Sequence, residues 1–442
     1  MPVETIGIRR EDKNEWERRA PLTPADAAAV QAATGARVLV EPSPIRIFPD
    51  AAYREAGVTV TPDAVNADLL LAVKEIPPVL YRPGHVYACF SHTIKGQPYN
   101  MPALKTLLER RATLVDYERI TDDAGRRLIF FSTHAGYAGM IESLRALGKR
   151  LAWRGLATPL AEVRHAWEYG ELAAAEADLR RIGEQMAAAG LPGRDRPLVI
   201  GIAGYGNVSR GAQKILENLP VTRVAPEELP AAAGRPAATP LLLTVFHEEH
   251  MVRRRDGGPF DLQEYYRQPE LYESIFADHL PHLDLLVNSI FWTDRYPRLV
   301  TREWAREQFA GGGEPRLQVI GDISIDIEGA VELSIRATHP DVPCYVVDPV
   351  TGAVTPGEEG RGLCIMAVDN LPCELPRESS EHFSSLLRDM VVDLARADWS
   401  APLAALDLPG HLRRAVIAHQ GELAPDYAYL YDHLPADGEE RA

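Results

Sequence analysis

The sequence predicts an α/β protein with two domains, each built on a parallel sheet, separated by a cleft. Short apolar runs alternate with helical patterns along the chain, which is typical of βαβ units. The chain has 442 residues, well beyond the roughly 150 residues of a typical domain. A break rich in proline, glycine and charge at 191–195 separates two such series of elements.

Composition excludes several classes of partner. The chain has 63 acidic against 47 basic residues, a formal net charge of -16, so it has no general attraction for nucleic acid or anionic membranes. No apolar run approaches the roughly 18 residues of a membrane-spanning helix. The segment Met1–Gly7 lacks a signal-peptide pattern, and the four cysteines form no Cys-x-x-Cys. We expect a cytoplasmic protein whose partners are small molecules, with an oligomer possible.

The first series opens with a strand, a helix and a second strand. Thr5–Arg9 is the first predicted strand. A helix follows from Pro24, because Thr23 can cap it and proline suits the first helical position. Gly35 ends this helix, and Arg37–Val40 is the next strand.

Three further predicted strands end next to side chains that can carry chemistry. They are Asp68–Val73 before Lys74, Val86–Ser91 before His92, and Ala112–Val115 before Asp116 and Glu118. Carboxyl ends of parallel strands meet at one rim, so we expect Lys74, His92 and Glu118 to converge there. An exposed lysine, a buried histidine and a turn carboxylate are the plain structural alternatives. Only six basic residues are lysines, and lysine can cycle its proton where arginine cannot, which favours a site. Lys95, close behind His92, is expected to bind a substrate carboxylate at the same rim.

A helical region extends from His134 to about Gly190 and is expected to pack and link the domains. Its apolar stripe consists of Leu172, Leu179, Ile182 and Met186.

A glycine motif opens the second series. A predicted strand, Leu198–Ala203, precedes it, and a predicted helix, Ala212–Leu219, follows. In this context Gly-x-Gly-x-x-Gly predicts dinucleotide binding, because backbone amides and a helix N-terminus can approach the pyrophosphate. Ser209 replaces the third glycine, and Gly211 follows. The expected cofactor residues here are Gly204, Gly206, Asn207, Val208 and Ser209.

The residue after the next strand is expected to contact the cofactor ribose. That strand is Val221–Val224, and Ala225 follows it where NAD-binding proteins carry an acidic residue. With Arg223 nearby, NADP(H) is favoured and NAD(H) remains possible, since Glu227 and Glu228 follow closely.

The later strands Leu285–Asn288 and Leu317–Gly321 fit the same sheet, with Asp322 and Asp326 just beyond the second. We therefore expect a dinucleotide-binding domain with linking helices over 136–374. A substrate and catalytic domain is expected over 1–135, completed by about 375–442.

His247-Glu248-Glu249-His250 does not predict a metal site. Its histidines are three residues apart, not four as in His-Glu-x-x-His, and no third ligand is evident. No metal is expected.

Motifs spread over nearly the whole chain resemble lysine–2-oxoglutarate reductase, the N-terminal half of aminoadipic semialdehyde synthase. The segments are Ile6–Asp12 (IGIRRED), Trp16–Leu22 (WERRAPL), Phe90–Lys95 (FSHTIK), Gly204–Ser209 (GYGNVS) and Val368–Pro372 (VDNLP). The broader superfamily includes saccharopine dehydrogenase, alanine dehydrogenase and a transhydrogenase subunit.

The resemblance implies two Rossmann-like domains with parallel sheets and an active site in the cleft between them. The family's acid–base pair falls on Lys74 and His92, the residues that the strand ends also indicate. Other family positions fall on Arg19, Glu118 and Arg127 for the substrate, and on Asp322, Asp326 and Asn370 for the cofactor.

The predicted function is an NAD(P)-dependent oxidoreductase of lysine degradation. It forms or cleaves a secondary amine between an amino acid, lysine in the first instance, and 2-oxoglutarate, giving saccharopine or a similar opine-like product. One alternative is an alanine-dehydrogenase-type enzyme that uses ammonia. Another is a non-catalytic NADP-binding regulatory protein.

Overall fold

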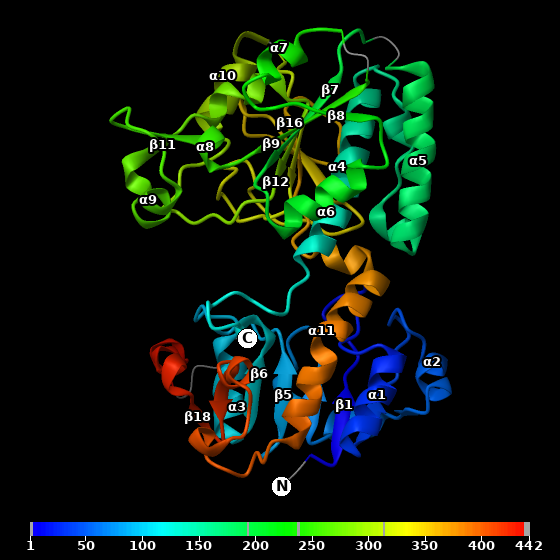
Figure 1. Ribbon diagram of the computed structural model, residues 1–442, viewed down its shortest axis with the longest axis vertical. Coiled ribbons are helices and arrows are strands. Elements are labelled where there is room, and N and C mark those ends of the chain that lie inside the picture. Colours follow the sequence, from blue (N-terminus) through cyan, green and yellow to red (C-terminus); the bar gives the residue numbers. More distant parts are fainter. Residues whose placement is uncertain (1–2, 192–193, 237–238, 313, 437–442) are drawn as a thin grey trace. The chain divides into compact units, whose positions relative to one another are not determined.

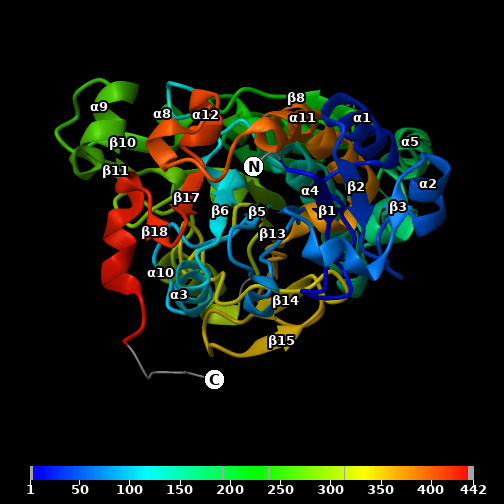
Figure 2. The same ribbon diagram turned by 90° about the horizontal axis from the view of Figure 1, so that it is seen from below.

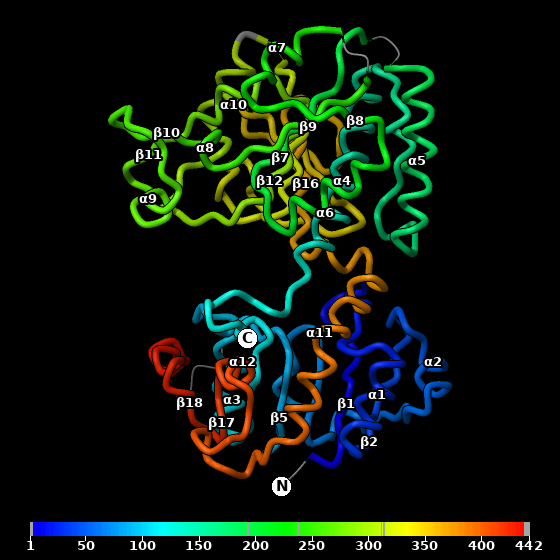
Figure 3. Tube along the Cα trace, viewed as in Figure 1, coloured from blue at the N-terminus to red at the C-terminus, as the bar shows by residue number. Residues whose placement is uncertain are grey.

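The computed structural model describes residues 3–191, 194–236, 239–312 and 314–436. The chain divides into two compact units: unit 1 comprises Met1–Phe131 and Pro376–Ala442, and unit 2 comprises Ser132–Leu375 (Figure 1). The backbone therefore passes from unit 1 into unit 2 and later returns, as the trace in Figure 3 shows. Within the described ranges each unit holds an eight-stranded, mainly parallel sheet. The predicted fold class of two Rossmann-like α/β domains is confirmed.

The sheet of unit 1 contains the five strands predicted from the start of the sequence. In spatial order its strands are β18 (Glu422–Leu423), β17 (Val416–His419), β6 (Thr113–Asp116), β5 (Val86–Cys89), β4 (Leu69–Leu71), β1 (Thr5–Ile8), β2 (Arg37–Val40) and β3 (Thr59–Val60). The strands from β6 to β3 pair in parallel, whereas β17 pairs antiparallel with both β6 and β18. The two strands at the antiparallel end come from the returning part of the chain and were not predicted.

Helices cover both faces of this sheet, as Figure 2 shows. On one face lie α1 (Pro24–Thr34) and α11 (Pro376–Arg396), and on the other lie α3 (Met101–Glu109) and the 3-10 helix η12 (Pro425–His433). As predicted, Thr23 caps α1 by accepting a hydrogen bond from the Asp26 amide at 3.1 Å. Gly35 ends the helix with φ at 73°, a conformation that glycine adopts without strain.

The sheet of unit 2 has a strand order that the sequence did not predict. The order is β15 (Val354–Pro356), β14 (Cys344–Val347), β16 (Leu363–Met366), β13 (Val319–Asp322), β12 (Leu285–Asn288), β7 (Leu198–Ala203), β9 (Leu241–Phe246) and β8 (Val221–Arg223). β7 thus lies between β12 and β9, and β8 lies outside β9 at the end of the sheet. The chain reaches β8 before β9, so the second strand of the series is not the neighbour of the first.

One face of this sheet is covered by α4 (Ser132–Trp153), α5 (Leu172–Ala189) and α6 (Asn207–Leu216) (Figure 1). The region predicted to be helical from His134 to about Gly190 is interrupted in its middle. Two 3-10 turns, η4 (Pro159–Glu162) and η5 (Ala166–Tyr169), separate α4 from α5. Gly155 and Gly170 adopt positive φ angles of 80° and 75° there, which an α-helix cannot contain.

Helix α6 begins at Asn207, earlier than predicted, and crosses α4 at two glycines. A Cβ atom on Gly136 would collide with the carbonyl oxygen of Val208, and one on Gly211 would collide with that of Thr133. Gly211, the last glycine of the motif, therefore allows two helix backbones to approach closely.

We expect Gly211→Ala to lower the free energy of unfolding by about 1–3 kcal/mol, the cost of forcing an extra group into a packed site. Urea unfolding followed by tryptophan fluorescence measures the change. Gly234→Ala is the control, because the nearest atom to its added Cβ is 3.6 Å away, and its effect should stay within about 0.5 kcal/mol. Equal stability of the two variants would contradict the packing role.

Candidate active site

The predicted convergence of strand ends is present in unit 1. β4, β5 and β6 are parallel neighbours, and Lys74, His92 and Glu118 follow their last residues at the same end of the sheet. β1 lies on the other side of β4. We call the segments that follow β1, β4, β5 and β6 the C-terminal rim of unit 1: residues 9–20, 72–76, 90–95 and 117–120. The rim holds side chains far apart in the sequence within one small region.

His92 is held firmly at the rim. Its Nδ1 lies 2.7 Å from Oε1 of Glu75, and its carbonyl oxygen accepts a hydrogen bond from Nδ2 of Asn100 at 3.0 Å. Its φ of 52° lies in the left-handed region, which costs energy in a non-glycine residue and occurs most often at functional sites. A carboxylate can only accept a hydrogen bond, so Nδ1 carries a proton. The other ring nitrogen, Nε2, is then the atom that can exchange a proton.

Glu75 links His92 to Lys13. Nζ of Lys13 lies 3.0 Å from the same carboxylate oxygen. Burial alone would raise the pKa of the Glu75 carboxyl, but the hydrogen bond and charge of His92 and the charge of Lys13 lower it to about 2. Glu75 therefore stays ionised near neutral pH and keeps His92 oriented.

Lys74 has an environment that favours loss of its proton. Burial is the main cause that lowers the pKa of the Lys74 ammonium, and the positive charge of Arg19 lowers it further. Glu17 and Glu75 oppose this change. A lysine with a lowered pKa can act as a base closer to neutral pH than an exposed one.

Arg19 forms a buried ion pair with Glu17. Nε and Nη2 of Arg19 donate to the two carboxylate oxygens at 2.7 Å and 2.5 Å, and both side chains are buried. The guanidinium lies over the ring of Phe131, 4.4 Å from its centroid. The pair places a paired, desolvated cation beside Lys74.

Glu118 and Arg127 form an ion pair with each other. The amide of Glu118 also donates to the buried carboxylate of Asp116 at 2.8 Å, and the hydroxyl of Ser91 donates to the same carboxylate. Burial raises the pKa of Asp116 to about 6. Lys95 is exposed on the loop behind His92. The structure therefore places Arg19 beside Lys74 and Lys95 on the loop behind His92, and it pairs both Arg19 and Arg127 with protein carboxylates.

The glycine loop of unit 2 fits a dinucleotide. Gly204 has a φ of 97°, and Gly206 directly precedes α6, so Asn207, Val208 and Ser209 form the first turn of the helix. Gly206 has no side chain to cap the first amides, which leaves them to an anion such as a pyrophosphate. A pocket of about 430 Å³ lies beside the loop; its walls include Gly204, Gly206, Glu248, Tyr266, Ser289 and Ile290.

The sheet order changes which residue lies closest to the expected ribose position. Ala225 is predicted as the ribose contact because it follows the next strand in the sequence, but β9 lies between β7 and β8 in the sheet. The amide of Gly204 donates to the carbonyl oxygen of Phe246, the last residue of β9. His247 and Glu248 therefore follow the strand next to the glycine loop. Glu248 lines the pocket.

Contacts between side chains order this region. The ring of His247 stacks on Tyr205, with centroids 4.2 Å apart. The hydroxyl of Tyr266 donates to Oε1 of Glu248 at 2.7 Å. His250, the other histidine of the sequence motif, accepts a hydrogen bond from the amide of His247 through Nδ1.

Three other predicted cofactor residues lie beyond β13 and β16. Asp322 ends β13 and is buried, with Asn288 and Ser334 both donating to its carboxylate. Burial raises its pKa to about 6. Asp326 is exposed in the following loop, and Asn370 directly precedes a short 3-10 helix, Leu371–Glu374.

Several charged residues of the rim and the pocket were missed from the sequence. Glu75 is adjacent to Lys74, and Glu17 lies two positions before Arg19, so proximity in sequence could have indicated both. Glu11 and Glu248 gave no such signal, because their roles depend on strands that pair across long sequence separations.

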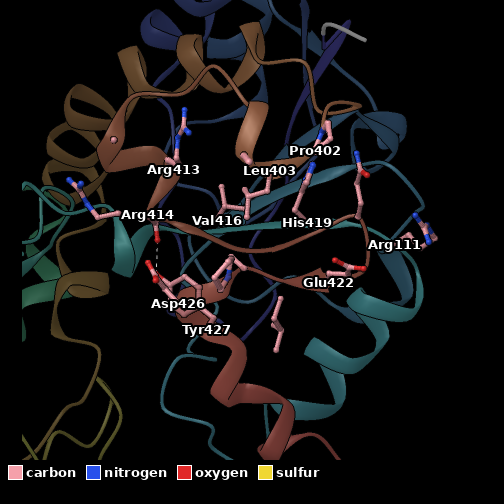
Figure 4. Close-up of a pocket in the computed structure, with 16 residues that line it drawn as sticks. Arg111, Pro402, Leu403, Arg413, Arg414, Val416, His419, Glu422, Asp426 and Tyr427 are labelled. Carbon is pink, nitrogen blue, oxygen red and sulfur yellow. Dashed lines mark hydrogen bonds between the residues drawn. The ribbon is translucent and has the colours of Figure 1, made fainter.

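A further cavity in unit 1, of about 680 Å³, lies along β17 and contains none of the predicted site residues (Figure 4). The ring of His419 there lies between Oγ1 of Thr113 and the carbonyl oxygen of Ala401, at 2.8 Å and 2.9 Å. The Tyr427 hydroxyl donates to the carbonyl oxygen of Arg414. These polar groups are engaged within the unit.

Comparison with known proteins relates the whole chain to one group of proteins. Residues 7–138 match the family described as alanine dehydrogenase/PNT, N-terminal domain, and residues 261–426 match alanine dehydrogenase/PNT, C-terminal domain. The structure resembles an L-alanine dehydrogenase, with a TM-score of 0.61 at 19% identity over 98% of this chain and 100% of the other. A transhydrogenase from Sinorhizobium meliloti gives a TM-score of 0.53 at 17% identity, over 95% of this chain and 100% of the other. Both share the fold.

Sequence relatives are closer. Alpha-aminoadipic semialdehyde synthase of Arabidopsis thaliana is 37% identical over 96% of this chain and 41% of its own length. The mitochondrial enzyme of that name from Bos taurus is 35% identical over 96% of this chain and 47% of its own length. The chain thus spans less than half the length of these two relatives. Saccharopine dehydrogenase [NAD(+), L-lysine-forming] of Neurospora crassa is 29% identical, over 90% of this chain and 93% of its own.

Over the described part of the chain, no helix is long and apolar enough to cross a membrane. The two domain matches, which together cover more than half of the chain, show that the chain belongs to the alanine dehydrogenase/PNT family.

Proposed function

We propose that the protein is an NAD(P)-dependent oxidoreductase that joins lysine and 2-oxoglutarate through a secondary amine, or cleaves that amine. The names and similarity of its relatives support this activity. The observation that carries the proposal is the location of Lys74 and His92 after neighbouring parallel strands, on one rim. One side chain has a lowered pKa, and the other is oriented by an ionised glutamate.

The chemistry needs two proton transfers besides the reduction. The substrate ammonium must lose a proton before its nitrogen attacks the oxo carbon, and the resulting carbinolamine must lose water. Lys74, with its lowered pKa, accepts the ammonium proton, and Nε2 of His92 protonates the leaving hydroxyl. The bound nicotinamide cofactor supplies the hydride that reduces the imine.

The dicarboxylic substrate requires cations. Arg19 and Arg127 each carry a forked guanidinium suited to a carboxylate, and Lys95 adds a point charge at the same rim. Because Glu17 and Glu118 already pair with the two arginines, we propose that a substrate carboxylate joins these pairs and does not meet isolated cations. Arg19 is buried and Arg127 exposed, so Arg127 is the more accessible of the two.

Replacing either member of the acid–base pair should abolish most turnover. We expect Lys74→Met and His92→Gln each to lower kcat by about 100-fold or more, the usual contribution of a positioned proton-transfer group. Cofactor affinity should stay unchanged. Oxidation of NADH or NADPH with lysine and 2-oxoglutarate measures turnover, and nucleotide fluorescence titration measures binding. Lys149→Met is the matched control, because Lys149 lies in α4 of unit 2. Normal rates in both rim variants would exclude the proposed roles.

The same assay separates the second candidate function. An alanine-dehydrogenase-type reaction, favoured by the family match, would consume pyruvate and ammonia in place of 2-oxoglutarate and lysine. Cofactor binding without turnover of lysine and 2-oxoglutarate, or of pyruvate and ammonia, would indicate a regulatory protein.

The revised ribose position favours NAD(H) over NADP(H). A carboxylate at the end of the strand beside the glycine loop can accept hydrogen bonds from ribose hydroxyls and repels a 2′-phosphate. Glu248 is such a carboxylate, and Tyr266 orients it. The earlier preference for NADP(H) depended on Ala225, which lies one strand further away.

Glu248→Gln should therefore lower the ratio of kcat/KM for NADH to that for NADPH by about 10-fold or more, because about 1.4 kcal/mol of interaction corresponds to tenfold. Steady-state kinetics with each cofactor measures the ratio. Glu227→Gln, which removes a carboxylate near Ala225, is the control and should leave the ratio unchanged. A ratio that changes in Glu227→Gln but not in Glu248→Gln would instead place the ribose beside the residues that follow β8.

A further inference from the structure

Glu11 connects two neighbouring strands at the C-terminal rim. It follows β1, and its carboxylate reaches the segment that follows β4. Oε1 accepts a hydrogen bond from the amide of Val73 at 2.6 Å, and Oε2 accepts one from the amide of Lys74 at 3.1 Å. The side chain is buried, with 5% of its surface exposed. One carboxylate therefore holds the backbone of Lys74 itself and of the residue before it.

We propose that Glu11 is a positioning residue that fixes the Val73–Lys74 backbone and so aims the Lys74 amine. This inference rests on the proposed function, which gives Lys74 its acid–base role. A carboxylate accepts from two donors at once without donating, so it suits two adjacent amides that point the same way. A buried backbone amide without an acceptor is costly. Loss of either hydrogen bond would therefore leave the Val73–Lys74 backbone less restrained, and with it the position of the Lys74 side chain.

The charge state of Glu11 changes in the physiological range. Burial is the main cause that raises its pKa to about 7, and the charge of Glu17 adds to this rise. The two amides and the charge of Arg9 oppose it.

Two further titratable groups lie close to this carboxylate: Cys89 at the end of β5 and Tyr117 after β6. The charge of Glu11 contributes to the raised pKa of the Cys89 thiol and of the Tyr117 hydroxyl. Protonation turns one acceptor oxygen into a hydroxyl, so the double hydrogen bond is intact above about pH 7 and weakened below it. Turnover should therefore fall as pH decreases through this value.

Asp68 provides a matched comparison at the opposite end of the same strands. Its Oδ2 accepts hydrogen bonds from the amides of Glu4 and Thr5 at 3.0 Å and 2.9 Å. Asp68 thus links β4 to β1 in the same manner as Glu11, but away from Lys74. Asp68 is only partly buried, and its substitution controls for the loss of a carboxylate that links these two strands.

The test compares Glu11→Gln with Asp68→Asn in the full chain. Glutamine keeps the size of the side chain but turns a donor toward an amide. We expect Glu11→Gln to lower kcat by 10-fold or more, to change KM for lysine and 2-oxoglutarate by less than 3-fold, and to leave cofactor affinity unchanged. The part of the decrease in kcat that protonation of Glu11 causes below about pH 7 should also be lost, so that kcat depends less on pH there than in the wild type. Asp68→Asn should lower the melting temperature but keep the wild-type kcat and pH profile.

Two outcomes would overturn the inference: a wild-type kcat and pH profile in Glu11→Gln, or equal losses of kcat in both variants. Should Glu11→Gln fail to fold, Glu11→Asp replaces it. Aspartate keeps the charge but reaches one amide, so an intermediate kcat supports the role and a wild-type kcat overturns it. Normal turnover of Lys74→Met would instead overturn the proposed function. Failure of the proposed function can therefore be told apart from failure of the positioning role of Glu11.

Discussion

The candidate active site of unit 1 depends on the parallel pairing of four neighbouring strands. Because β1, β4, β5 and β6 all run in the same direction, the chain leaves each of them at the same end of the sheet. Side chains from four separate segments then meet without any long loop to bring them together. Glu11 connects two of these segments by hydrogen bonds. The site therefore inherits the rigidity of the sheet, which proton transfer between fixed groups requires.

Burial of charge gives the rim its chemical character. Desolvation of an ion is expensive unless a partner compensates for it, and here Glu17 pairs with Arg19 while Asp116 accepts from Ser91 and a backbone amide. The same burial lowers the pKa of Lys74. Groups with perturbed pKa values cluster where proton transfer occurs, and the rim brings several of them together.

The sequence was most informative where structure is local. Strand ends and the caps of α1 follow from residue patterns, so Lys74, His92 and Glu118 could be located before the structure was known. Residues that act across strands could not, since Glu11 reaches Val73 through pairing that local patterns do not encode. The prediction of Ala225 as the ribose contact has the same limit, because it followed the order of strands in the sequence, whereas β9 lies between β7 and β8 in the sheet. The prediction of a helical region from His134 to about Gly190 missed the interruption between α4 and α5. Gly155 and Gly170 adopt positive φ angles there, within an otherwise alanine-rich pattern.

We propose above all that the rim joins the amine of lysine to the oxo carbon of 2-oxoglutarate. Mass spectrometry of the product formed from lysine labelled with ¹⁵N at its side-chain nitrogen, 2-oxoglutarate and NADH tests this most directly. We expect one product with the mass of saccharopine that retains both carbon skeletons and the label. Absence of this product, together with alanine formed from pyruvate and ammonia, would contradict it.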